Sequence, residues 1–258
     1  RLCGAFVRYR LAHAQMLRKA GDAPAEIALH QEILAQPMWR SASVAGRSGA
    51  TTAAAEAEAA ITELVLQDPK LYAAYDVKAA AQFDAIKTDA DVKPETLLAI
   101  ADEFPLSNSA LPALQLASEK FEADHRTRDT TRTLRRILQR ADKKDLKVAT
   151  LEALARNYTM LPNQLDLALV RLEQAARLDP AKRLSKPIKA GNETIDGSPL
   201  AEAAAMMRIQ RDLQAREALP LLGLRSGADL PPDQEAFAAP MELAGVSEKI
   251  GRASCRER

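Results

Sequence analysis

The stretch 151–180, LEALARNYTMLPNQLDLALVRLEQAARLDP, decides the fold of this chain. Apolar residues recur at spacings of three and four over 144–160 and again over 163–178, which is the period of an amphipathic helix. Two such helices joined by a short turn at Pro162 form an antiparallel hairpin. A hairpin of this size cannot bury its apolar stripe alone, so we expect it to pack on similar neighbours.

A second stretch with the same pattern, LQLASEKFEADHRTRDTTRTLRRI, occupies residues 114–137. Seven apolar or small residues fall at matching offsets: Leu114, Ala117, Ser118 and Phe121 correspond to Leu151, Leu154, Ala155 and Tyr158, and Thr130, Leu134 and Ile137 correspond to Ala168, Leu172 and Ala175. The repetition predicts that the second-helix residues of both copies are buried between hairpins, namely Leu134, Ile137, Leu172 and Ala175.

The composition extends this interpretation to the whole chain. Hydrophobic residues make up 47% of the sequence and aromatic residues only 4%, and helical spacing continues almost throughout. We therefore predict an all-α protein with one small β-hairpin near 188–195, where Ile188 and Ile195 flank a Gly191-Asn192 turn. The expected helices cover 5–20, 23–36, 51–67, 70–87, 94–103, 109–124, 129–141, 144–160, 163–178 and 198–218.

The two matching stretches resemble the tetratricopeptide repeat family. That family places a bulky residue, a leucine, a small residue and an aromatic on the first helix, then Ala, a bulky residue, Ala and a closing Pro on the second. The first copy has Asp142 where the proline is expected, whereas the second keeps Pro180 with one extra residue in its turn. The resemblance covers roughly 5–180 and is looser in its first half. It implies an α-solenoid of degenerate tetratricopeptide-like antiparallel hairpins.

A further resemblance concerns the order of segments. The runs LLAIADEFPLSNSALPALQLASEKF (97–121), KPIKAGNETIDGSPLAEAA (186–204) and AFAAPMELAGV (236–246) are similar to the helical portion of large bacterial envelope proteins that carry pyrroloquinoline-quinone-like β-propeller repeats. The resemblance implies a bacterial cell envelope or periplasmic location, and a cytoplasmic location stays open.

The chain divides into four segments. The tetratricopeptide-like repeats are expected in 1–180, and a hairpin with a closing helix in 181–218. Residues 219–248 are rich in Pro, Gly and Asp and predict a linker. The tail 249–258, KIGRASCRER, can be back-translated into the start of a common sequencing adapter, and we expect it to be foreign to a longer gene product.

Charge and cysteine content narrow the function classes. The formal net charge is +1, and the basic run 126–136 is interrupted by Asp129, so we expect a solvated face and no nucleic-acid partner. No apolar run reaches the length of a membrane span. Cys3 is the one cysteine before the tail, which predicts no disulfide framework.

No residue set predicts catalysis or a cofactor. His13, His30 and His125 lack the spacing of metal ligands and are expected in surface or packing roles. The acidic pairs Asp102-Glu103 and Glu119/Glu122 are typical of a solvated helix face. We therefore expect a protein that is not an enzyme and holds no metal or cofactor.

The repeat resemblance implies a concave groove as the binding surface. In its register, six side chains line the groove: Gln115, Glu119, Glu122, Glu152, Arg156 and Thr159. Glu119 and Glu152 are expected to face it as solvated acids, which favours a neutral or basic partner segment. These observations predict a non-catalytic scaffold for protein or interdomain contacts in a larger bacterial protein. The alternative is a helical accessory domain of an enzyme whose active site lies elsewhere.

Overall fold

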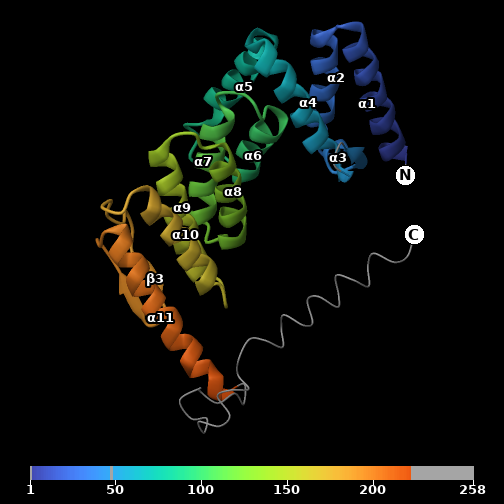
Figure 1. Cartoon of the computed structure of the whole chain (residues 1–258). Helices are drawn as coiled ribbons and strands as arrows, with labels where there is room; N and C mark the ends of the chain where they lie inside the picture. The colour runs from blue at the N-terminus through green and yellow to red at the C-terminus, as the bar shows by residue number, and fades with distance from the viewer. Residues whose placement is uncertain (1, 47–48, 222–258) are drawn as a thin grey trace, which may run out of the picture.

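The computed structural model describes residues 2–46 and 49–221 and is mostly helical. Figure 1 shows the helices following chain order along an elongated molecule, from α1 at one end to α11 at the other. Consecutive helices from α6 to α11 pack against one another, as do α1 and α2. The predicted predominance of helix is confirmed.

The N-terminal part contains two short elements that the sequence pattern did not predict. Its elements are α1 (Leu2–Ala20), α2 (Ala23–Ala35), α3 (Pro37–Arg40), β1 (Ser43–Gly46), β2 (Gly49–Thr52) and α4 (Ala53–Gln67). Asp22 caps α2 by accepting a hydrogen bond from the amide of Ala25, and Pro24 lies in the first turn. The hairpin β1–β2 and the helix α3 were missed. The helix predicted at 51–67 begins at Ala53, because residues 51–52 belong to β2.

The middle of the chain follows the predicted helices closely. It contains the 3₁₀ turn η1 (Pro69–Tyr72), α5 (Ala73–Ile86), α6 (Pro94–Glu103), α7 (Ala110–Ala123) and α8 (Thr127–Arg140). The helix predicted at 70–87 is divided, because Asp68 accepts a hydrogen bond from the amide of Lys70 and holds the first residues in a tighter turn.

The C-terminal part consists of α9 (Lys144–Thr159), α10 (Leu165–Leu178), β3 (Ile188–Ala190), β4 (Glu193–Ile195) and α11 (Leu200–Leu221). The antiparallel pair β3–β4 places Ile188 opposite Ile195 and turns at Gly191, whose φ of +61° suits glycine. The predicted small hairpin is confirmed. Residues 219–221, expected in a linker, belong to α11. The remaining linker 222–248 and the tail 249–258 lie outside the described residues.

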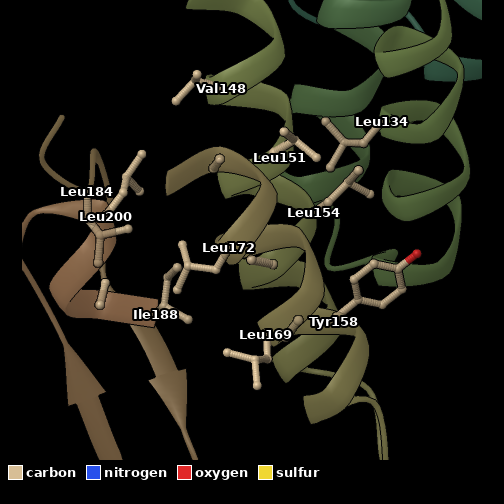
Figure 2. Packing of buried hydrophobic residues seen from close by; sticks show 14 of the residues in the cluster. Leu134, Val148, Leu151, Leu154, Tyr158, Leu169, Leu172, Leu184, Ile188 and Leu200 are labelled. Atoms are coloured by element: carbon tan, nitrogen blue, oxygen red, sulfur yellow. The ribbon is translucent and has the colours of Figure 1, made fainter. Parts of the chain in front are cut away.

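The largest hydrophobic cluster joins α6 to α11 and includes the strands β3 and β4. Figure 2 shows Leu172 of α10 near its centre, with Leu154 of α9 on one side and Ile188 of β3 on the other. All four residues expected between hairpins are buried in it: Leu134, Ile137, Leu172 and Ala175. That prediction is confirmed, and the closing segment after residue 180 shares this core with α9 and α10 through Leu184 and Leu200.

A separate hydrophobic cluster holds the N-terminal helices together. Ile27 and Ile33 of α2 pack in it with Ile61 of α4, Val44 of β1 and Tyr72 of η1. Two smaller clusters lie around α5, α6 and α7. The protein therefore has two main apolar centres, one near each end of the described chain.

Candidate functional site

A cleft of about 180 Å³ lies between α7 and α9, where the predicted groove residues meet. Gln115, Glu119 and Glu122 line it from α7 and Arg156 lines it from α9, with Lys186 from the following loop. The first three lie on one face of α7 because they are separated by four and three positions. Four of the six residues named from the sequence are therefore brought together.

Ion pairs order one side of this cleft. Arg156 donates from Nε and Nη2 to Oε1 of Glu122, at 3.1 and 2.9 Å, and its side chain is only 9% exposed. Lys186 Nζ lies 3.4 Å from the other oxygen of Glu122. Two cations therefore compensate Glu122, while Glu119 is exposed at the rim. The acid that an incoming group meets first is Glu119.

The expectation that Glu152 is a solvated groove acid is wrong. Glu152 is 1% exposed, and its Oε1 accepts hydrogen bonds from the amide and hydroxyl of Ser185, both at 2.6 Å, and from the amide of Lys186 at 3.3 Å. A buried carboxylate oxygen that accepts several hydrogen bonds joins the groups that donate to it. Glu152 therefore anchors the loop before β3 to α9 and is not available to a partner.

Thr159 also lies away from the cleft. Its hydroxyl donates to the carbonyl of Arg156 at 2.8 Å, and its side chain lines a different hollow with Met160 and Gln164. Thr159 is the last residue of α9, and there it lies beside the turn to α10 instead of facing α7. The structure does not bring Thr159 together with the other candidates.

Two arginines of the basic run, Arg135 and Arg136, are paired with aromatic and acidic side chains. Arg136 forms an ion pair with Asp102, which also pairs with Arg40 at 2.8 Å. Arg135 donates from Nε to the hydroxyl of Tyr158 at 2.8 Å. On the same helix, Arg140 pairs with Glu58 of α4 at 2.9 Å. These contacts tie α8 to α3, α4, α6 and α9.

A second hollow, which the sequence pattern did not indicate, lies among α1, α2, α4 and β1. We call it the N-terminal pocket; its volume is about 380 Å³. Leu11, Gln15, Arg18, Glu26, His30, Ala45, Gly46, Glu56 and Ala60 line it. The signal that could have revealed it is the spacing of Glu26 and His30, which are four residues apart and so share one face of α2.

Glu26 is the most enclosed charged group of the N-terminal pocket, with 1% of its surface exposed. Its Oε1 accepts from Nε of Arg18 at 2.8 Å and lies 2.7 Å from Nη2 of the same side chain. The hydrogen bond that Arg18 donates to Glu26 raises the pKa of Arg18, against the effect of burial. Nε2 of His30 lies 3.6 Å from the same carboxylate oxygen, and Arg18 also pairs with Glu63 at 3.1 Å.

Burial lowers the pKa of His30 below its ordinary value of 6.5, with the Glu26 carboxylate opposing this effect and Arg18 adding to it. The unfolded chain therefore binds a proton at His30 before the folded chain does as the pH falls through 6.5. We expect His30 to reduce the free energy of unfolding below pH 6.5, by at most about 1.4 kcal/mol per pH unit. His30→Gln should lose that part of the pH dependence.

Urea unfolding of both proteins at neutral pH and at about pH 5.5 measures this difference. The carboxylates titrate in both proteins, so the comparison isolates the imidazole. His13, which is exposed on α1, supplies the control His13→Gln, and this variant should keep the wild-type pH dependence. An identical pH dependence in wild type and His30→Gln would contradict the expectation.

Within 2–46 and 49–221, no three His, Cys, Asp or Glu side chains form a group that could hold a metal ion. In the same ranges no helix has both the length and the apolar character needed to cross a bilayer. Comparison of the sequence and the structure with protein-family models, with curated proteins and with solved structures finds no match. The resemblance to tetratricopeptide repeats therefore stays a prediction.

Proposed function

We propose that this chain is a non-catalytic helical-repeat scaffold that docks a protein segment, or a neighbouring domain of a larger bacterial protein, in the cleft between α7 and α9. The observation that carries the proposal is the meeting of Gln115, Glu119, Glu122 and Arg156 at one cleft. The repeat register of the sequence predicts a shared surface for these same residues. Their convergence supports a common surface on the first helices of successive hairpins.

The packing pattern supports the same proposal. Leu114 and Phe121 of α7 and Leu151 and Tyr158 of α9 are buried at matching offsets, so the two helices turn equivalent faces to the core and leave equivalent faces outside. Helical repeats use such a row of outward faces to bind extended partners. A tetratricopeptide-like α-solenoid attached to a β-propeller in the bacterial envelope is the finer form of this proposal.

The charges of the cleft favour a basic partner segment. Glu122 is already compensated by Arg156 and Lys186, whereas Glu119 is exposed. A basic side chain of a partner would be attracted by Glu119 without displacing the ion pairs of Glu122. Opposite charges across an interface act mainly on the specificity and the rate of association.

The test titrates the whole chain with basic, neutral and acidic fluorescent peptides of equal length and measures affinity by anisotropy. Wild type should prefer the basic peptide. Glu119→Lys should weaken that binding about fivefold, which is the scale of one exposed charge pair. Glu202→Lys, an exposed position on α11 away from the cleft, is the matched control and should bind as wild type does. Equal affinity of wild type and Glu119→Lys for the basic peptide would contradict the assignment of the cleft.

A further inference from the structure

We propose that the N-terminal pocket binds a compact cation that carries N–H donors, an alkylammonium or guanidinium group. This site is distinct from the cleft between α7 and α9, because it lies at the N-terminal end of the molecule, between α1, α2, α4 and β1, whereas the cleft lies in the middle. The inference depends on two buried acceptor atoms, on the net charge of the pocket and on its apolar walls.

The first acceptor is Oε2 of Glu26. This atom is buried and has no hydrogen-bond partner, although Oε1 of the same carboxylate accepts a hydrogen bond from Arg18. An ionised carboxylate can only accept hydrogen bonds, so the group that satisfies Oε2 must be a donor. Buried polar atoms without partners are rare in folded proteins, and each one requires a physical reason. A donor supplied by a ligand is such a reason here.

The second acceptor is Nδ1 of His30, which is also buried without a partner. Nε2 of the same ring faces Oε1 of Glu26 at 3.6 Å. A proton on Nε2 is favoured by this carboxylate, which leaves Nδ1 as a lone-pair acceptor in the neutral ring. The lowered pKa of His30 keeps the ring neutral at pH 7. Both unsatisfied atoms of the pocket therefore require donors.

The charges around the pocket favour a donor that is positive. Glu26, Glu56 and Arg18 are the charged side chains that line the pocket. Two carboxylates and one guanidinium give this lining a net negative charge. A cation compensates this charge, whereas an anion or a neutral donor of the same size does not.

The walls of the pocket suit a short alkyl group behind the charge. Leu11, Ala45 and Ala60 supply apolar surface. At Gly46 of β1, an added Cβ would lie 2.5 Å from the Thr51 side chain and 3.1 Å from the Glu56 carboxylate, so this strand backbone closely approaches both groups. The combination of buried acceptors on two lining residues and small apolar walls matches an alkylammonium or a guanidinium on a short chain.

The experiment titrates the whole chain with butylammonium and methylguanidinium chloride and follows amide and imidazole chemical shifts. Butanol and acetate are the matched neutral and anionic probes. Both cations should shift His30 and Gln15 with saturation, and butanol and acetate should not. Glu26→Gln should weaken cation binding at least about tenfold, and Glu56→Gln about threefold, since each removes one carboxylate. Glu202→Gln, an exposed position on α11 away from both sites, should leave the affinity unchanged.

Circular dichroism checks that each variant is folded. If Glu26→Gln does not fold, the probe series and Glu56→Gln decide the question. A lack of saturable binding of both cations to wild type would overturn the proposal. So would equal binding of butanol and butylammonium, or unchanged affinity in the carboxylate variants. None of these outcomes affects the peptide test of the cleft, so the two proposals fail separately.

A further arm of the experiment identifies the source of the cation. A short end-capped peptide with a single Arg or Lys is compared with the free cations through the shifts of His30 and Gln15, which report on the N-terminal pocket and not on the cleft. At least about tenfold tighter binding of the peptide assigns the pocket to a basic side chain of a partner protein. Equal affinity assigns it to a free small amine. Both results support the shared chemistry of an ammonium or guanidinium group.

Discussion

Leu172→Ala should lower the free energy of unfolding by about 2–5 kcal/mol, the range for removing a large aliphatic side chain from a packed core. Leu172 is fully buried in α10, with α9 on one side and the β3–β4 hairpin on the other (Figure 2). The smaller side chain leaves a cavity that both neighbours would have to close. Because the helices are packed in chain order, few other contacts can compensate.

Urea unfolding followed by circular dichroism measures the change. The matched control is Leu167→Ala on the same helix, where the leucine is 38% exposed. This variant should lose about 1 kcal/mol or less, because much of the side chain already meets water. A loss below about 0.5 kcal/mol in Leu172→Ala would mean that the hairpins do not pack in the register described here.

Glu152→Lys should destabilise the fold by about 3–5 kcal/mol, the cost of breaking a buried charged network and leaving an unpaired charge. The carboxylate of Glu152 accepts hydrogen bonds from the amides of Ser185 and Lys186 and from the hydroxyl of Ser185. A lysine would place a cation against donors and one helical turn before Arg156, where like charges repel. The loop that leads to β3 would then lose its attachment to α9.

Two further variants separate the loss of the charge at residue 152 from the effect of a charge reversal at an exposed position. Glu152→Gln keeps an acceptor oxygen but loses the charge, so we expect an intermediate loss of about 1–2 kcal/mol. Glu119→Lys makes the same charge reversal at an exposed residue of α7, and we expect a change within about 0.5 kcal/mol. If Glu152→Lys were as stable as Glu119→Lys, this result would contradict the role of Glu152 as a buried residue that attaches the loop to α9. Glu152 would then be a solvated acid of the groove, as the sequence predicted.

The sequence predicted those parts of the fold in which hydrophobic period and turn chemistry agree. The helix expected at 94–103 has the observed bounds of α6 because a proline starts it and its apolar stripe is regular. The hairpin at 188–195 was predictable because Gly191 supplies the left-handed turn and two isoleucines mark the buried face. By contrast, only Val44 of β1 is buried, so that strand has no alternating pattern to detect.

The site was less predictable because it depends on contacts distant in sequence. Gln115, Glu119, Glu122 and Arg156 meet as the repeat register indicated. Glu152 shares the helix of Arg156, but its environment is set by a loop 33 residues later, which no helical register contains. The N-terminal pocket was missed for a similar reason: Arg18, Glu26 and Gly46 come from different elements, and only folding brings them together.

The division of the apolar core has a consequence for how the molecule opens. One cluster unites α6 to α11, and another unites α1, α2 and α4, with no buried residue in common. Between them, pairs such as Arg140 with Glu58 join α8 to α4 through polar contacts. Each centre can therefore act as its own cooperative unit. Amide hydrogens of α1 and α2 can exchange with solvent through sub-global opening while α9 and α10 remain closed.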